Sequence, residues 1–253
     1  MWHAGPGPLS FPTPVNHRRH LLARIHRRFE TITEPVHVGA LNLSFTRIKD
    51  PNRVLDEVAA EEDRRDKLAG HQRPDDELHL PYWAELWDSS LAIIDFLAET
   101  LPQRFDDVSK LSVLDLGCGM GLTGTVAAAL GARVLFGDLE PDALLFARLN
   151  AMPFADRVRT RRLNWQKARL TEQFDVIIGA DILYDKTQWQ YLEPFWRGHL
   201  KRHGTVLLGE PGRQTGGMFL DWIKPHPWSL TQLKKTVPTR TVPIRLFELK
   251  RLA

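Results

Sequence analysis

The sequence predicts an α/β fold built on a doubly wound, mostly parallel sheet with helices on both faces. Three observations predict it. Apolar strand segments alternate with helical segments from residue 111 onward, which is typical of repeated βαβ units. Segment 174–181, FDVIIGAD, is a continuous apolar run, as expected for a buried parallel strand. Segment 113–124, VLDLGCGMGLTG, reads as a buried strand that ends in a glycine-rich turn before a helix.

The composition fits one α/β domain with an extension. The chain has 253 residues, of which 43% are hydrophobic and 26% are charged, which is ordinary for a soluble protein. A formal net charge of +3 does not by itself indicate nucleic-acid binding, and no apolar run approaches the length of a membrane span. A single cysteine, Cys118, excludes an internal disulfide and favours a reducing compartment, so we expect a cytoplasmic protein. We expect no metal site, because the ten histidines lack the spacing of metal ligands. We also expect the protein to be a monomer.

Residues 1–29 predict a flexible, proline-rich tail followed by a short basic helix. Four apolar residues share one face of this helix: Leu21, Leu22, Ile25 and Phe29. No acidic residue precedes Glu30, so an organelle-targeting presequence is an alternative. The prolines and the lack of serine enrichment favour a basic surface helix instead.

Residues 30–80 predict an extension that consists of a hairpin and a helix. The alternating pattern of residues 30–50 predicts two short strands around Gly39. A charged helix follows over 53–72, and Gly70 is suited to end it.

Residues 81–253 predict the main domain, which begins with an amphipathic helix from about Ser89, capped by Asp88 or Ser89. Strands are expected at 111–116, 133–138, 158–165, 174–181 and 204–212, followed by an antiparallel pair at 229–237 and 242–250. Helices are expected at 121–132, 141–151, 186–200 and 215–223. Pro141 occupies the favoured first helical position, and Pro194 interrupts or kinks its helix. These elements give a seven-stranded sheet with an antiparallel last strand.

The glycine-rich turn predicts a ligand that lies against bare backbone. Gly119, Gly121 and Gly124 match the G-x-G-x-x-G pattern of dinucleotide enzymes. An acid at the strand end, Asp115, suits an ammonium group and would repel a pyrophosphate. This combination favours S-adenosylmethionine, which has no phosphate and carries an ammonium on its tail; a dinucleotide and a turn without a ligand are the alternatives. We expect the turn to contact this cofactor through Asp115, Gly117, Cys118, Gly119 and Gly121.

Asp138 ends the second strand of the main domain, 19 residues after Gly119. A carboxylate there can accept hydrogen bonds from both ribose hydroxyls. NAD enzymes place an acid at the same point, so Asp138 indicates a ribose without identifying the cofactor. Glu140 competes for this role, and either acid can instead serve as a capping charge before Pro141.

Polar and aromatic side chains also follow the third strand and precede the sheet. Asn164 and Trp165 can hydrogen-bond and stack on an adenine, although a tryptophan at a strand end can also belong to the core. Trp87 is expected over the methionine part of the cofactor, where a cation–π contact with a sulfonium contributes about 0.5–2 kcal/mol. Trp83 is expected in the core.

The fourth strand ends in the tetrad Asp181-Ile182-Leu183-Tyr184. The small residue Ala180 permits close approach to a ligand, and Asp181 would then project toward the reactive methyl group. The alternative is that Asp181 caps the following helix and Tyr184 packs on it.

Together these segments resemble the class I, seven-strand, Rossmann-like S-adenosylmethionine-dependent methyltransferases. Within that class the chain is most similar to methyltransferase family 16, which includes many protein lysine methyltransferases. The resemblance runs from about Pro81 to the C-terminus through PYWAELWDSSLAIIDFL, VLDLGCGMGLTG, VLFGDLEP, LNW and GADILYD. Segment 207–216, LLGEPGRQTG, resembles the branch that methylates the electron-transfer flavoprotein β subunit, with Glu210 where that branch usually has aspartate.

The resemblance implies that Trp87, Gly117 to Gly119, Asp138, Trp165 and Ala180 line the cofactor. It implies that Asp181 and Tyr184 face a protein lysine and orient its amine for in-line methyl transfer. Three alternatives stay open. They are a small-molecule N- or O-methyltransferase, an NAD-linked oxidoreductase, and a non-catalytic module whose basic stretch Arg18–Arg28 binds nucleic acid or acidic lipid.

Overall fold

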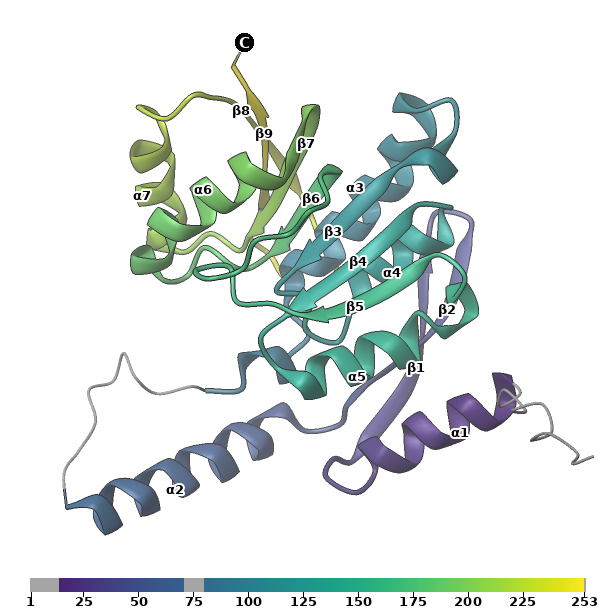
Figure 1. Ribbon diagram of the computed structural model, residues 1–253, viewed down its shortest axis with the longest axis vertical. Coiled ribbons are helices and arrows are strands. Elements are labelled where there is room, and N and C mark those ends of the chain that lie inside the picture. Colours follow the sequence, from purple (N-terminus) through teal and green to yellow (C-terminus); the bar gives the residue numbers. More distant parts are fainter. Residues whose placement is uncertain (1–13, 71–79, 253) are drawn as a thin grey trace, which may run out of the picture.

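A seven-stranded sheet forms the centre of the protein, as the sequence predicts (Figure 1). The computed structural model describes residues 14–70 and 80–252, so the predicted tail before residue 14 and the stretch 71–79 lie outside the described residues. The strands are β3 (Ser112–Leu116), β4 (Arg133–Asp138), β5 (Val158–Arg162), β6 (Phe174–Ala180), β7 (Leu200–Glu210), β8 (Trp228–Lys235) and β9 (Ile244–Arg251). Their order in the sheet is β5-β4-β3-β6-β7-β9-β8.

The order and direction of the strands create a switch point between β3 and β6. Strands β5, β4, β3, β6 and β7 are parallel, and β9 runs antiparallel to both β7 and β8. The mostly parallel sheet with an antiparallel last strand is therefore confirmed. The chain moves outward from β3 to β5 and then crosses to β6 on the other side, and ligands of doubly wound sheets bind at such a point, beyond the strand ends.

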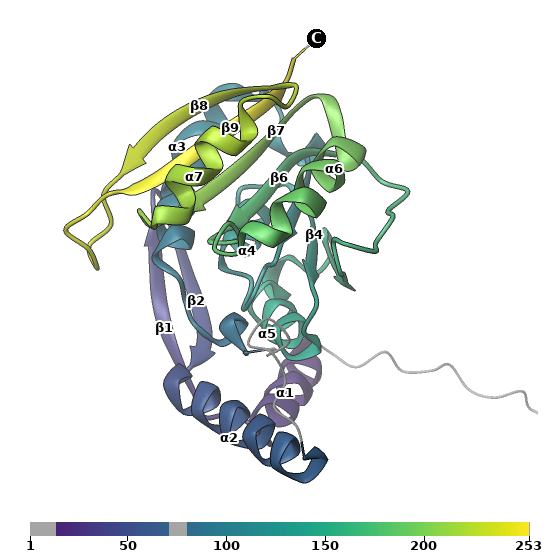
Figure 2. The same cartoon turned by 90° about the vertical axis from the view of Figure 1, so that its left-hand side faces the viewer.

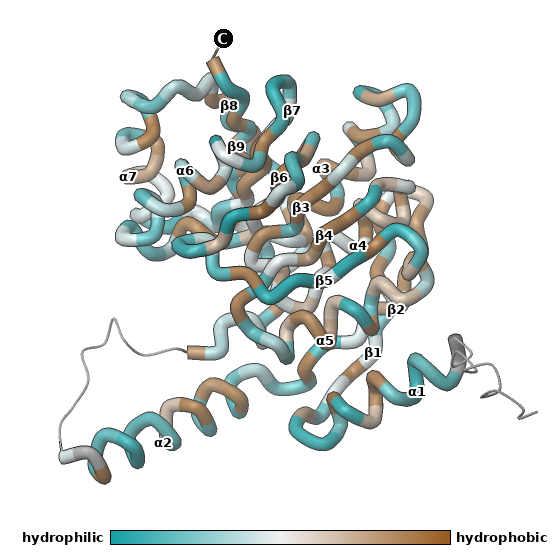
Figure 3. The backbone as a smooth tube through the Cα atoms, in the orientation of Figure 1, coloured by the Kyte–Doolittle hydropathy of each residue, from teal (hydrophilic) through white to brown (hydrophobic). Residues whose placement is uncertain are grey.

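Helices cover both faces of the sheet (Figures 1 and 2). One face carries α3 (Asp88–Arg104), α4 (Leu122–Ala129) and α5 (Pro141–Asn150), and the other carries α6 (Trp189–His199) and α7 (Gln214–Ile223). Residues of β3 alternate between the two cores, since Val113 packs with the first helices and Leu114 with the second. Hydrophobic colour accordingly concentrates in the central strands (Figure 3).

The N-terminal extension consists of α1 (Pro14–Ile25), β1 (Thr31–Val38), β2 (Leu41–Ile48) and α2 (Pro51–Ala69). The hairpin around Gly39 is confirmed, as is the end of α2 at Gly70, whose φ of 71° is left-handed. Helix α2 starts two residues earlier than expected, because the Asp50 carboxylate accepts a hydrogen bond from the Arg53 N–H and Pro51 fits the first turn. The expected basic helix is α1, which buries Leu21 in a shared core with α5 and the hairpin.

Some local predictions for the main domain are wrong. Helix α3 begins at Asp88 after Trp87, without a side-chain cap, because the Asp88 carboxylate instead accepts a hydrogen bond from the Thr239 hydroxyl at 2.5 Å. Strand β5 ends at Arg162, before the expected 165, and β7 begins at Leu200 instead of 204. Tertiary contacts decide these boundaries more than local sequence does. Across the described residues 14–70 and 80–252, no helix combines the length and hydropathy needed to cross a membrane.

Close packing at Gly124 predicts a loss of stability when it is replaced by alanine. A Cβ at Gly124 would lie 2.3 Å from Cε1 of Phe136 and 2.8 Å from Oδ2 of Asp115. We expect Gly124→Ala to lower the free energy of unfolding by about 1–3 kcal/mol, the usual cost of overpacking. The matched control is Gly217→Ala in α7, where a Cβ would meet nothing within 4 Å and alanine favours the helix. Equal urea-unfolding midpoints for the two variants would contradict the packing argument.

Candidate active site

The glycine turn between β3 and α4 presents bare backbone at the switch point. Gly117, Gly119 and Gly121 have φ values of 66°, 52° and 83°, which lie in a backbone region that residues other than glycine rarely adopt. The N–H groups of Gly117 and Cys118 both donate to the Gly137 carbonyl, at 2.8 and 3.2 Å, and tie the turn to β4. A ligand at this point can therefore approach the main chain closely. Cys118 itself is buried, as expected for a small packed residue.

Asp115 lies beneath the turn and not on its open side. Asp115 is only 1% exposed, and its two carboxylate oxygens accept hydrogen bonds from the Thr123 hydroxyl and the Gly124 N–H, both at 2.8 Å. The predicted contact between this carboxylate and a ligand ammonium is therefore corrected, because the side chain is buried below the turn, where it holds the first turn of α4. Burial is the main cause that raises the Asp115 pKa to about 7.

The raised pKa of Asp115 makes stability depend on pH. The folded protein holds this proton more tightly than the unfolded chain, whose aspartate has an ordinary pKa of 3.8. The stabilising contribution of Asp115 is complete below pH 4 and is lost as pH rises through 7. We expect wild type to lose stability relative to Asp115→Asn between pH 4 and pH 8, by about 4 kcal/mol. Denaturant unfolding across this range tests it, and parallel curves for the two proteins would contradict the assignment.

Asp138 is the buried acid at the end of β4. It is 7% exposed, and its oxygens accept hydrogen bonds from the N–H groups of Gly119 and Glu140, each at 2.9 Å. Burial raises the pKa of Asp138, and these backbone hydrogen bonds oppose the rise. Glu140, its competitor, is partly exposed and makes no side-chain cap on α5. The structure therefore places Asp138, and not Glu140, against the glycine turn.

Asn164 and Trp165 lie just beyond β5, at the same end of the sheet. The Asn164 side-chain oxygen accepts a hydrogen bond from the Gln166 N–H at 2.9 Å. The Trp165 indole N–H donates to Gln188 at 3.1 Å, and its ring lies 3.6 Å from the position that a Gly117 Cβ would take. The ring is partly exposed beside the turn, so it is not a fully buried core tryptophan.

Asp181 follows the last residue of β6, the partly exposed Ala180, in an unusual backbone conformation. Its φ is 57°, its N–H donates to the Gly209 carbonyl at 2.9 Å, and the residue is 7% exposed. Burial raises the Asp181 pKa, and its contacts with Arg213 oppose the rise. The alternative role as a helix cap is wrong, because Asp185 caps the next turn through the Thr187 N–H.

Tyr184 and the segment before α3 form an aromatic edge next to Asp181. Tyr184 is 44% exposed, and its ring centroid lies 5.7 Å from that of Tyr82. Trp87 donates its indole N–H to the Tyr82 carbonyl at 3.0 Å. Trp83 packs on Phe146 with the core, as expected. The Tyr184 ring therefore packs on Tyr82.

Arg213 is the residue of this site that sequence reasoning did not single out. Its Nε and Nη2 donate to the two carboxylate oxygens of Asp181 at 3.2 and 2.9 Å. Its guanidinium carbon lies 5.4 Å from the centre of the Trp87 ring. The only signal in the sequence is the Pro-Gly-Arg segment after β7, which carried a family resemblance but no assigned role.

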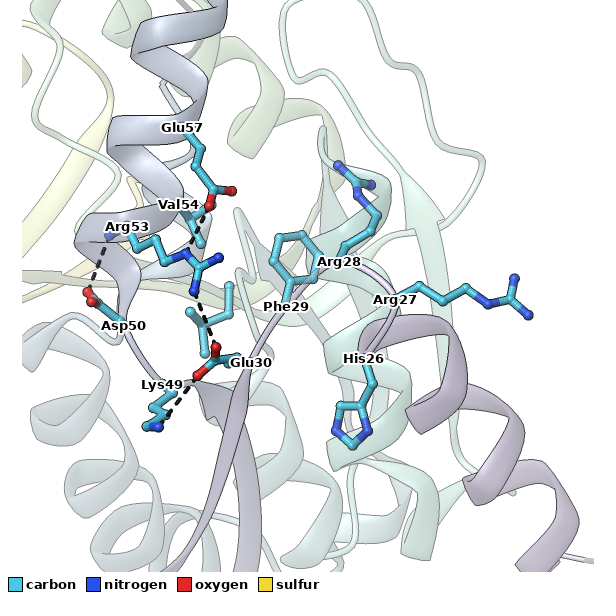
Figure 4. Close-up of a pocket in the computed structure, with 11 residues that line it drawn as sticks. His26, Arg27, Arg28, Phe29, Glu30, Lys49, Asp50, Arg53, Val54 and Glu57 are labelled. Carbon is cyan, nitrogen blue, oxygen red and sulfur yellow. Dashed lines mark hydrogen bonds and ion pairs between the residues drawn. The ribbon is translucent and has the colours of Figure 1, made fainter.

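A separate hollow of about 320 Å³ is lined, among the described residues, by those of the N-terminal extension (Figure 4). Arg53 pairs there with Glu30 and Glu57, and Lys49 also pairs with Glu30. These paired charges join the hairpin to the start of α2. None of the lining residues comes from a strand end of the main sheet, so the hollow is distinct from the site at the switch point.

The order of the strands, together with the arrangement of residues at their ends, is that of a class I methyltransferase. Residues 80–224 match the family model described as lysine methyltransferase, which covers more than half of the 253 residues. The chain therefore belongs to this lysine methyltransferase family.

Named relatives agree with this membership. The chain is 36% identical over 141 residues to the electron transfer flavoprotein beta subunit lysine methyltransferase of Mus musculus, which covers 53% of this chain and 51% of that protein. It is also 36% identical over 154 residues to protein N-lysine methyltransferase METTL21A of Xenopus tropicalis, which covers 56% of this chain and 67% of that protein. The matched segment thus spans about half the length of the first relative.

A solved structure agrees with the fold. Magnesium protoporphyrin IX methyltransferase from Synechocystis, with S-adenosylmethionine bound, superposes with a TM-score of 0.53 at 16% identity. The superposition covers 81% of this chain and 98% of that protein.

Proposed function

We propose that the protein transfers a methyl group from S-adenosylmethionine to the side-chain nitrogen of a lysine in another protein. Membership of the lysine methyltransferase family supports this proposal, as do relatives named for methylating protein lysines. The observation that carries it is the position of Asp181. A buried carboxylate at the end of β6 lies at the switch point of the sheet, where a hydrogen-bond acceptor can orient an incoming amine.

The residues at the strand ends fit the chemistry of this cofactor. Asp138 is a buried carboxylate whose hydrogen bonds in the described structure come from backbone N–H groups, so lone pairs of its oxygens are suited to a ribose diol. Gly119 offers partly exposed main chain, and Trp165 offers a partly exposed ring for an adenine. The residues that would hold the cofactor are Trp87, Gly117, Cys118, Gly119, Gly121, Asp138, Asn164, Trp165 and Ala180. When bound, S-adenosylmethionine supplies a methyl group on a positively charged sulfur.

The protein's own residues must prepare the lysine. From a reference pKa of about 10.4, removing the ammonium proton at pH 7 costs about 4–5 kcal/mol. Asp181 would accept a hydrogen bond from the resulting amine and align its lone pair, and Tyr184 would fix the direction of approach. Solvent takes the released proton, so Asp181 need not act as a general base.

Labelled cofactor tests the class of acceptor. We expect purified protein with radiolabelled S-adenosylmethionine to label a protein band in extract from cells that lack this gene, and mass spectrometry to locate the label on lysine. The electron-transfer flavoprotein β subunit is the first purified acceptor to try, because relatives are named for it. Label only in the small-molecule fraction would favour the alternative of a small-molecule methyltransferase.

The cytoplasmic location and the monomeric state remain predictions. The single buried thiol, Cys118, supports a reducing compartment. Light scattering of the purified protein, with a chain mass of 29.0 kDa, tests the monomer.

A further inference from the structure

One cation, Arg213, contacts both the Asp181 carboxylate of the proposed acceptor site and the ring of Trp87. Its fork-shaped guanidinium donates to both oxygens of Asp181, and it lies over the ring of Trp87. The Asp181 side chain is 4% exposed and the Arg213 side chain is 41% exposed. Arg213 therefore closes the solvent side of a nearly buried carboxylate, at the point where the amine of a lysine would arrive.

The backbone of Arg213 is held in place from behind. Glu210 is 1% exposed, and its carboxylate accepts hydrogen bonds from the N–H groups of Gly212 and Arg213. Arg245 donates to Glu210 at 2.6 Å and to the Arg213 carbonyl at 2.9 Å. Gly212 adopts a φ of 95°, which lets the turn close. This network fixes the direction in which the Arg213 side chain leaves the turn, so the contact with Asp181 is preorganised.

A glycine in α7 makes room for this network. A Cβ at Gly216 would lie 2.3 Å from Cδ of Glu210 and 2.5 Å from Nη2 of Arg245. The pair of Glu210 and Arg245 therefore fills the space that a side chain at Gly216 would take. A hydrogen-bonded support of this kind is characteristic of a site whose geometry is set in advance.

The charges around Asp181 come from three elements. Arg213 at the start of α7 and Arg240 in the connection before β9 favour its charged form, and Glu210 at the end of β7 opposes it. Burial is the main cause that raises the pKa of Tyr184, and the nearby Asp181 charge adds to the rise. Of the two cations, Arg213 alone is within hydrogen-bond distance of the carboxylate among the residues described.

We propose that Arg213 is a positioning residue that neutralises Asp181, so that the acceptor site admits an uncharged amine in preference to an ammonium. The inference rests on the proposed function and deepens it. A free carboxylate would stabilise an ammonium and hold the lysine in its unreactive form. A carboxylate already paired with a guanidinium can still accept a hydrogen bond from a neutral amine, whereas an ammonium would meet the guanidinium charge.

Sinefungin tests this without knowledge of the acceptor, because it is an analogue of S-adenosylmethionine that carries an amine where the cofactor carries its transferable methyl group. The measured quantity is the ratio of its affinity to that of S-adenosylhomocysteine, by calorimetry at pH 7. We expect Arg213→Gln to raise this ratio about tenfold, because an ammonium would then face an unpaired carboxylate. Arg213→Lys keeps a positive charge there and should give a ratio near that of wild type. The matched control is the exposed Arg169→Gln, which should leave the ratio unchanged.

A second variant keeps the test independent of how Arg213→Gln folds. Asp181→Asn leaves Arg213 without its carboxylate partner and should lower the sinefungin ratio below that of wild type. Unchanged ratios in folded Arg213→Gln and Asp181→Asn proteins would overturn the inference while leaving the proposed function intact. Failure of wild type to bind either nucleoside would instead count against the proposed function itself.

Discussion

Replacing Asp181 with asparagine is expected to lower methyl-transfer turnover about 100-fold, the scale of effect for a group that orients a reactant. Asparagine tolerates the left-handed backbone that Asp181 adopts at a φ of 57°, so the main chain should keep its shape. What is lost is the negative charge that accepts a hydrogen bond from the amine and pairs with Arg213. Initial rates of label transfer to the acceptor, at saturating cofactor, measure the effect.

Asp185→Asn is the matched control, because Asp185 lies in the same loop but caps the turn Lys186–Gln188. We expect its turnover to stay within about twofold of wild type, as for a substitution outside the site. The affinity of Asp181→Asn for S-adenosylhomocysteine should also change little. Wild-type turnover in Asp181→Asn, or an equal loss in both variants, would show that Asp181 does not face the acceptor.

Asp138→Ala is expected to weaken S-adenosylhomocysteine binding by at least about 30-fold. A charge-assisted hydrogen bond contributes about 1.5–3 kcal/mol, and the variant would lose its bonds to the ribose hydroxyls. It would also release the Gly119 N–H, which donates to Asp138 at 2.9 Å and shapes the turn. Calorimetric titration of purified variant and wild type measures the affinity.

Glu140→Gln provides the comparison for Asp138, because Glu140 is the competing acid two residues away. We expect it to bind S-adenosylhomocysteine within about threefold of wild type, since Glu140 makes no side-chain cap and is partly exposed. A larger loss in Glu140→Gln than in Asp138→Ala would exchange the two roles.

Strong local signals made most of the fold predictable from the sequence. The apolar run of β6 fits a strand buried on both faces, and the buried pattern along it agrees. Gly39 and Gly70 stand where left-handed backbone is required, and Pro141 stands at the start of α5. In each case the residue type itself limits the backbone to few conformations.

The sequence-based predictions are wrong where a side chain has possible hydrogen-bond partners both nearby and far away in the sequence. Asp88 has the chemistry of a helix cap, yet it bonds to Thr239, 151 residues later. Asp115 has the charge to attract an ammonium, yet burial places it under the turn. Arg213 and Asp181 are 32 residues apart and meet only because β6 and β7 are neighbours in the sheet. Spacing along the chain does not reveal such contacts.

We infer that the ends of β3, β4, β5 and β6 hold a sulfur nucleoside. Titration of the wild-type protein with S-adenosylhomocysteine and, separately, with NAD measures this most directly. We expect saturable heat with S-adenosylhomocysteine that Asp138→Ala abolishes or greatly weakens, and no binding of NAD. Saturable binding of NAD, with no heat from either S-adenosylmethionine or S-adenosylhomocysteine, would contradict it.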